Sequence, residues 1–148
     1  DIYTTDAAGL AATRSTFPNP GNHIILPEII SKEPLSAAVR QGDDQWADIV
    51  RWVFNATLTA EELGINSGNV GNMMSSNNPE VLRLLGVEGS QGEELGLSRD
   101  WAYQIIKQIG NYGEIFERNI GPNTPMGLER GLNDLWTRGG LQHSPPFR

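Results

Sequence analysis

The residue best placed to do chemistry is Asp6, which stands where a predicted strand ends and a predicted helix begins. Residues 1–5 are rich in types that favour strands, and residues 7–12 follow as a short helix. In open parallel α/β sheets, ligands bind beside the carboxyl ends of strands and the N-termini of helices. A carboxylate there is a natural partner for an ammonium group, through a short charge-assisted hydrogen bond. Thr5 adds a hydroxyl beside it.

The same position suits a plain helix cap. Aspartate is one of the residues preferred at the residue before a helix, where its side chain accepts a backbone N–H. From spacing alone the cap is the more common role, so both interpretations of Asp6 stay open at this point.

Other combinations of reactive residues are missing from the sequence. His23 and His143 stand far from any metal-ligand spacing, and there are no cysteines. The glycine-rich stretch 68–71 lacks the Lys-Ser/Thr of a phosphate-binding loop. The adjacent carboxylates of Glu61-Glu62 and Glu93-Glu94 would point about 100° apart on a helix, which is typical of solvated faces. We therefore expect no metal site, no cofactor and no catalytic residue, and hence no enzyme.

Composition excludes two further classes of protein. The 148 residues carry 11 basic and 18 acidic side chains, a formal net charge of −7. Such a balance argues against nucleic-acid binding and against adhesion to anionic membranes. No apolar run approaches the ~20 residues that a membrane-spanning helix needs.

The predicted elements change character along the chain. Three short strands are expected in the first 40 residues, at 1–5, 23–26 and 35–40. Helix and loop follow, because apolar residues then recur at helical spacing. The first such stripe is Trp46, Ile49, Val50 and Val53. Further helices are expected to begin at Thr59, Pro79 and Ser98, and to cover Tyr112–Phe116 and Leu128–Trp136.

Three short strands cannot close a barrel or a sandwich. They need partner strands, either from sequence that this chain does not contain or from a second copy of it. Because Asp1 is followed at once by a strand-like run, we expect the chain to be part of a longer protein.

An ordered series of segments resembles one known family. Residues 1–11 (DIYTTDAAGLA), 23–28 (HIILPE), 31–40 (SKEPLSAAVR) and 42–52 (GDDQWADIVRW) are similar to successive segments of polar amino-acid-binding proteins of ABC uptake systems. The later segments 63–65 (LGI), 96–103 (GLSRDWAY) and 139–141 (GGL) are similar to one branch, the general L-amino-acid-binding periplasmic proteins. The resemblance runs over essentially the whole chain.

This resemblance implies an α/β fold, part of the two-lobe type II periplasmic-binding-protein fold. It would be a helix-rich C-terminal portion with about three short strands. Residues 1–30 would be the C-terminal part of lobe 2, and 31–38 the return hinge crossover. Residues 39–148 would be the C-terminal part of lobe 1 with additional helices.

The resemblance also implies a function. The protein would be the periplasmic solute-binding component of an ABC transporter, would bind an L-amino acid, and would deliver it to the membrane permease. Asp6, with Thr5, would hold the α-ammonium group of the ligand. In the family an arginine and further donors hold the α-carboxylate, and the matching segments lie outside this chain. Its partners would be the ligand, the permease and an N-terminal fragment or second copy that completes the sheets, with no nucleic acid.

An alternative from another class remains open. The chain would then exchange strands with a second copy and serve as a structural or interaction module that binds no small molecule.

Overall fold

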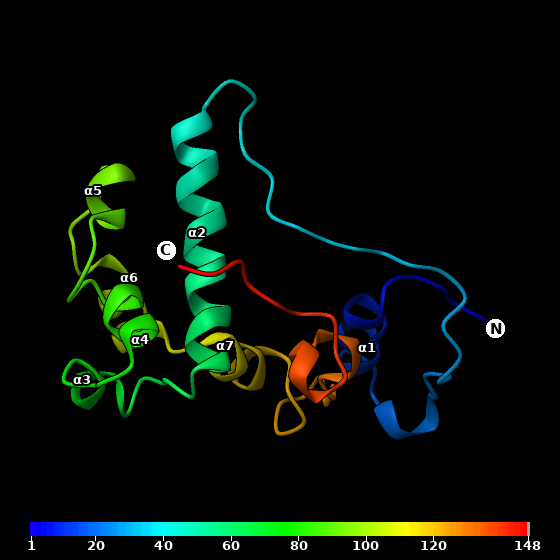
Figure 1. Ribbon diagram of the computed structural model, residues 1–148. Coiled ribbons are helices and arrows are strands. Elements are labelled where there is room, and N and C mark those ends of the chain that lie inside the picture. Colours follow the sequence, from blue (N-terminus) through cyan, green and yellow to red (C-terminus); the bar gives the residue numbers. More distant parts are fainter. Residues whose placement is uncertain (148) are drawn as a thin grey trace. The chain divides into compact units, whose positions relative to one another are not determined.

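The computed structural model describes residues 1–147, and helices are its regular elements (Figure 1). In chain order they are α1 (Ala7–Ser15), the 3-10 turn η1 (Pro20–Asn22), α2 (Asp44–Glu62), α3 (Val70–Met73), α4 (Pro79–Leu84), α5 (Gln91–Glu94), α6 (Trp101–Ile109), α7 (Tyr112–Asn119), and the 3-10 turns η2 (Gly131–Asn133) and η3 (Trp136–Arg138). Two compact units divide the chain. The first holds Asp1–Ala37 and Phe116–Arg130, and the second holds Ala38–Ile115 and Gly131–Arg148.

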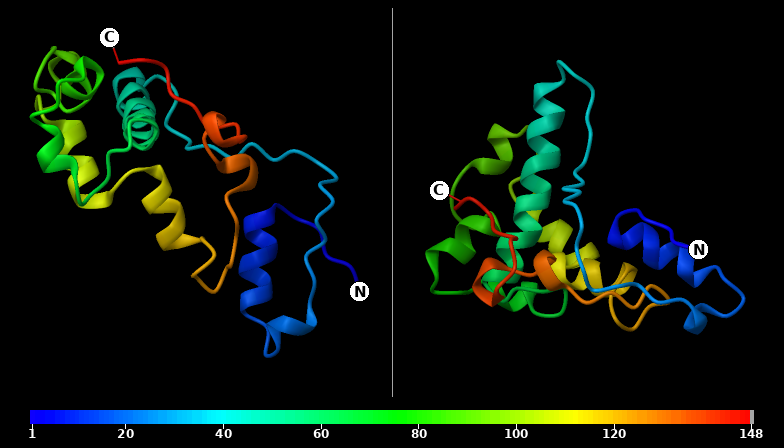
Figure 2. Two further views of the ribbon diagram at one scale, coloured as in Figure 1. Left: turned by 60° about the horizontal axis from the view of Figure 1, so that its bottom comes forward. Right: turned by 90° about the vertical axis from the view of Figure 1, so that its right-hand side faces the viewer.

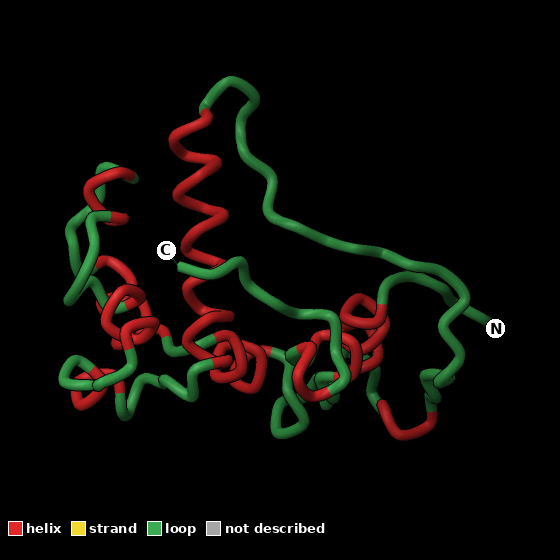
Figure 3. The backbone as a smooth tube through the Cα atoms, in the orientation of Figure 1, coloured by secondary structure: helices red, strands yellow, loops and turns green. Residues whose placement is uncertain are grey.

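The three predicted strands are wrong. Residues 1–5, 23–26 and 35–40 carry no regular secondary structure, and Figure 3 shows them as loops. Within the described residues, strand-like pairing is limited to an isolated bridge between Leu135 and Gln142. A strand needs a second backbone to satisfy its N–H and C=O groups, and no described segment forms ladder hydrogen bonds with these residues. The predicted α/β fold with about three strands is therefore, in this chain, a helix-rich fold.

Helix α2 confirms the apolar periodicity and extends beyond it. Its 19 residues run without a break, as both views of Figure 2 show, so the separate helix predicted to begin at Thr59 does not exist. No residue between Phe54 and Glu62 is a glycine or a proline, and nothing there interrupts the helix. Its N-cap is Asp43, whose side chain accepts a hydrogen bond from Trp46 N. The start of the predicted stripe is half exposed, since Trp46 retains 50% of its accessible surface.

The structure confirms some of the other expected helix boundaries and corrects others. Pro79 opens α4 as expected, and Gly110, at φ +92°, ends α6. The residue before α6 is Asp100 rather than the expected Ser98. The helix expected over Leu128–Trp136 is replaced by η2 and η3, because Gly127 and Gly131 adopt positive φ angles that an α-helix does not contain.

The core of the second unit gathers around α2. Helix α2 packs against α6 and α4, and α3 packs against α6. Ala56 and Ala60 of α2 offer a small-residue face to this core. The larger buried side chains are Ile65, Val70, Val81, Leu84, Leu85, Trp101, Ile106 and Phe147. Phe147 belongs to a tail that the sequence predicts as merely extended, and the neighbouring Arg148 lies outside the described residues.

None of the described helices combines the length and the apolar character required to cross a membrane.

Candidate ligand-binding site

The carboxylate of Asp6 is held at the start of α1. Asp6 is the N-cap residue, with an extended backbone at φ −62° and ψ 157°, and its Oδ1 accepts a hydrogen bond from Gly9 N at 2.8 Å. The predicted cap is thus confirmed. The side chain is partly buried, whereas Thr5 is exposed. The hydrogen bond from Gly9 N fixes the orientation of the carboxylate. It engages Oδ1 and leaves Oδ2 available for another donor.

Thr5 lies next to the second oxygen. The Thr5 hydroxyl donates to Asp6 Oδ2 at 3.4 Å, which is longer than the 2.5–3.0 Å of a good O–H···O bond. The structure therefore brings the two predicted site residues together, but with a weak contact. Asp6 Oδ2 keeps capacity for a stronger donor, such as an ammonium group.

Gly9 completes this arrangement, and sequence reasoning missed it. A Cβ atom built at Gly9 would come within 2.8 Å of Asp6 Oδ2 and 3.0 Å of Thr5 Cγ2. Any other residue at position 9 would therefore press on both side chains. The signal in the sequence is a glycine in the first turn of a predicted helix, where it serves neither a turn nor a helix end.

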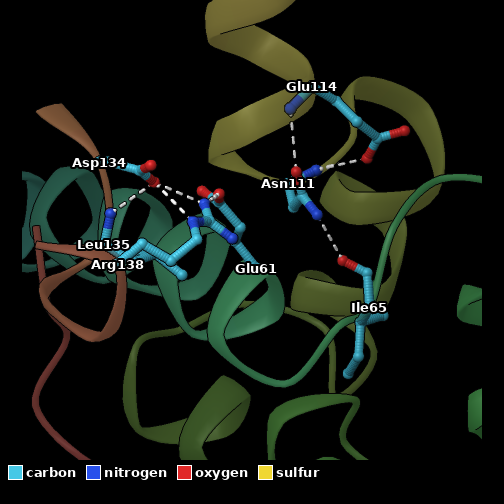
Figure 4. Close-up of polar contacts among 7 residues, drawn as sticks. All are labelled: Glu61, Ile65, Asn111, Glu114, Asp134, Leu135 and Arg138. Carbon is cyan, nitrogen blue, oxygen red and sulfur yellow. Dashed lines mark hydrogen bonds and ion pairs between the residues drawn. The ribbon is translucent and has the colours of Figure 1, made fainter. Parts of the chain in front are cut away.

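One polar cluster of the second unit joins the start of α7 to the loop after α2. Asn111 and Glu114 form a reciprocal capping box at the start of α7: Glu114 N donates to Asn111 Oδ1 at 2.9 Å, and Asn111 N donates to Glu114 Oε2 at 2.8 Å (Figure 4). Asn111 Nδ2 also donates to Ile65 O at 2.7 Å, and Ser67 N donates to Glu114 Oε2 at 3.0 Å. The cluster ties the loop after α2 to α7.

A second cluster binds η3 to α2 (Figure 4). The Arg138 guanidinium pairs with Asp134 at 2.6 Å and with Glu61, and these two carboxylates hold the pKa of Arg138 above its ordinary value. Trp136 Nε1 donates to Glu62 Oε1 at 3.0 Å. The expectation that Glu61 and Glu62 form a solvated face is therefore wrong for Glu61, whose side chain is 8% exposed. Sequence reasoning had no means of finding partners more than 70 positions away.

The histidines and the surface hollows add no site at Asp6. His23 packs its ring against Phe17, and His143 Nδ1 lies 3.3 Å from Leu141 O. Within residues 1–147 no three side chains of His, Cys, Asp or Glu gather as metal ligands would. Two shallow hollows of the second unit, of about 300 and 330 Å³, are lined around Phe147, and neither includes Asp6 or Thr5.

Comparison with known proteins places this geometry in context. No family model matches the chain. It is 58% identical over its whole length to the general L-amino acid-binding periplasmic protein AapJ of Rhizobium johnstonii. It is 56% identical to the glutamate/glutamine/aspartate/asparagine-binding protein BztA of Rhodobacter capsulatus. The chain spans 44% of the length of each of these relatives.

A solved structure agrees with these relatives. An ABC transporter periplasmic binding protein from Brucella ovis, solved with glutathione bound, superposes on 99% of the chain with a TM-score of 0.94 and 55% identity. The chain covers 46% of that protein. The resemblance inferred from the sequence is therefore confirmed: the chain is homologous to amino-acid-binding periplasmic proteins and shares the fold of the matching part of one.

Proposed function

We propose that the chain forms part of the periplasmic solute-binding component of an ABC transporter for L-amino acids. The observation that carries this proposal is the identity of 56–58%, along the whole chain, with relatives named for amino-acid binding. In this role the complete protein takes an L-amino acid from the periplasm and delivers it to a membrane permease. It is a binding protein and not an enzyme.

Asp6 is the proposed anchor for the α-ammonium group of the ligand, with Thr5 beside it. The Gly9 N–H fixes one carboxylate oxygen, and the other is in position to accept a charge-assisted hydrogen bond. L-Amino acids and the γ-glutamyl end of glutathione share an α-ammonium and an α-carboxylate group. A site that binds these two shared groups accepts both kinds of ligand without contacting the parts of the ligands that differ.

The proposed architecture is the two-lobe type II fold. Residues 1–30 belong to the end of lobe 2, 31–38 to the return crossover and 39–148 to lobe 1. The two compact units meet between Ala37 and Ala38, which supports the assignment of the crossover's end to residue 38. The grouping of Phe116–Arg130 with the first unit has no explanation in this assignment. Hinge closure about the crossover follows if the ligand binds the closed state better than the open one.

The alternative function, a strand-exchanged module that binds no small molecule, is not favoured. That function would be supported by relatives named as interaction proteins. The relatives of this chain are instead named for the amino acids they bind. The net charge of −7 supports a function without nucleic acid.

The test is calorimetry on a chimera in which the chain replaces the matching part of the Brucella ovis protein. L-Glutamate, L-glutamine and glutathione are titrated, and glutarate serves as the control because it lacks only the α-ammonium group of glutamate. We expect binding of at least one α-amino ligand and none of glutarate. A folded chimera that binds none of them, or that binds glutarate as well as glutamate, contradicts the proposal.

A further inference from the structure

The C-terminal end of α2 carries a carboxylate that forms no ion pair within the described residues. Helix α2 ends on Glu61 and Glu62 and has no basic residue in its last turn. The C-terminal end of a helix is partially negative, so cations stabilise it and carboxylates do not. Arg138 pairs with Glu61, whereas Glu62 accepts from a neutral indole, with 3.0 Å between Trp136 Nε1 and Glu62 Oε1. This helix end therefore keeps an uncompensated negative charge.

A second carboxylate faces the same hollow of the surface. The hollow of about 330 Å³ is lined by Glu62 of α2 and by Glu80 of α4. Arg83, one turn further along α4, donates through Nε to Phe147 O at 3.0 Å. The ion pairs found among the described residues include neither Glu62 nor Glu80. The hollow is therefore bordered by two negative charges without a cation between them.

An unpartnered hydroxyl in the same wall is an independent sign of a ligand. Thr59 lies one turn before Glu62 on α2 and also lines the hollow. Its side chain is 9% exposed, and Oγ1 has no hydrogen-bond partner among the described residues. Buried polar groups in folded proteins are nearly always paired, and the exceptions call for a specific explanation. An N–H donor that enters the hollow would satisfy this oxygen together with the carboxylates.

We propose that this hollow is a binding site for a guanidinium group on an alkyl chain. A guanidinium carries five N–H donors in a planar fork, which suits two carboxylates and a hydroxyl on separate walls. Trp136 is 62% exposed and offers an indole face on which the planar cation stacks. The alkyl chain lies against Leu63 and Pro146. The net charge of −7 attracts such a ligand at a distance.

The proposed site is separate from the one at Asp6. All the residues that line the hollow belong to the second compact unit, whereas Asp6 and Thr5 belong to the first. A metal ion is a poorer occupant, because within residues 1–147 no three side chains of His, Cys, Asp or Glu gather as its ligands. The inference goes beyond the proposed function and does not depend on it.

The experiment follows the indole N–H of Trp136 by nuclear magnetic resonance in the nitrogen-15-labelled chain. The chain has four tryptophans, and Trp136→Phe identifies the signal of this one. The ligand titrated is n-butylguanidinium, which has no ammonium group for Asp6, and n-butylurea is the control with the same shape and no charge. We expect a saturable shift with n-butylguanidinium and none with n-butylurea. A parallel titration with N-acetyl-arginine methylamide shows whether a free cation or a peptide arginine binds more tightly.

Variants locate the cation. Glu62→Gln and Glu80→Gln should each weaken n-butylguanidinium binding at least ~3-fold, and the double variant should abolish the saturable shift. Thr59→Val should also weaken it at least ~3-fold although the variant stays folded, because a hydrogen-bond acceptor is lost. Glu88→Gln is the matched control, since Glu88 is an exposed carboxylate of the same unit outside the hollow. It should leave the affinity unchanged.

Four results would overturn the proposal. They are a shift that does not saturate, an equal shift with n-butylurea, a Thr59→Val variant that binds as tightly as the parent, and a Glu88→Gln variant that loses as much affinity as Glu62→Gln. The parent and Arg148→Ala are titrated side by side. Binding seen only in Arg148→Ala would mean that the guanidinium of the chain itself takes the site, which contradicts an external ligand.

Discussion

The Asp6 carboxylate and the Gly9 backbone N–H lie 2.8 Å apart, and this bond links the stability of α1 to the direction of the proposed ligand anchor. One oxygen satisfies a donor that would otherwise be orphaned at the helix start. The other lies beside the Thr5 hydroxyl. The capping role and the proposed anchoring role of Asp6 can be separated by substitution, because aspartate and asparagine cap a helix equally well but differ in charge.

Replacing Asp6 separates the cap from the charge. Asp6→Ala removes the acceptor for Gly9 N and should lower the free energy of unfolding by ~1 kcal/mol, whereas Asp6→Asn should change it by only a few tenths. Chemical denaturation of both variants measures the difference. Equal destabilisation by alanine and asparagine would mean that the cap contributes nothing to stability.

Gly9→Ala tests the close approach to the anchor. Alanine in a helix interior is more stable than glycine by ~1 kcal/mol. At position 9, however, the added Cβ would lie only 2.8 Å from Asp6 Oδ2 and would push this oxygen away. We expect stability to stay level while ligand affinity of the chimera falls. Gly71→Ala in α3 is the control, since a Cβ there meets nothing within 4 Å, and it should leave affinity unchanged. Unchanged affinity in Gly9→Ala would show that the carboxylate need not hold this position.

Phe147→Ala tests how the C-terminal tail contributes to the core. The Phe147 ring is 5% exposed and lies 5.1 Å from Trp52 and 6.4 Å from Trp101, measured between ring centroids. Its carbonyl accepts a hydrogen bond from Arg83 Nε at 3.0 Å. Loss of a buried phenylalanine costs ~3–5 kcal/mol, which thermal or urea unfolding will detect. The exposed Leu141→Ala should be almost neutral, and a similarly neutral Phe147→Ala would place the tail outside the cooperative unit.

Thr59→Val should stabilise the chain. Thr59 is 9% exposed, and its Oγ1 has no hydrogen-bond partner among the described residues. Replacing an unsatisfied buried hydroxyl by a methyl group removes a desolvation penalty, with a gain of ~1 kcal/mol in the free energy of unfolding. Thr57→Val is the matched control, because Thr57 Oγ1 donates to Phe54 O at 2.8 Å and its loss should bring no gain. A Thr59→Val variant less stable than the parent would contradict the orphaned hydroxyl.

Asp100 should make stability depend on acidity at low pH. Hydrogen bonds from Gln104 and then from Ser98 lower the pKa of Asp100 below its ordinary value, and the Gln104 Nε2 to Asp100 Oδ2 distance is 2.6 Å. Because the folded pKa is depressed, the contribution is fully present above pH 3.8 and is lost as the pH falls through the folded value. Urea unfolding of the parent and of Gln104→Ala at pH 7 and below pH 3 should therefore converge on acidification. A constant difference would exclude this coupling.

The sequence predicts local features of the fold well. Helices α1, α2, α4 and α7 follow from apolar spacing and capping residues, which depend on neighbours within four positions. The strands fail because pairing depends on a backbone elsewhere. Within the described residues, the backbone hydrogen bonds of 1–5 and 23–37 are limited to local ones, from His23 N to Pro20 O and from Leu35 N to Glu33 O.

The candidate site could be predicted in part. Asp6 follows from its place between a strand-like run and a helix, and its capping bond confirms that local inference. The contribution of Gly9 requires a Cβ position that only the coordinates supply. The Arg138–Glu61 pair and the burial of Phe147 join segments distant in sequence, and no spacing rule indicates them. The ligand-binding role of Asp6 stays a prediction.

The most direct measurement is calorimetry of the chimera and of its Asp6→Asn variant with an L-amino acid that binds the parent. Asparagine keeps the helix cap and removes the charge, so a binding loss without unfolding isolates the anchor. We predict that affinity falls at least ~10-fold while circular dichroism and the unfolding midpoint stay level. An Asp6→Asn chimera that binds the same amino acid with unchanged affinity would contradict the central claim.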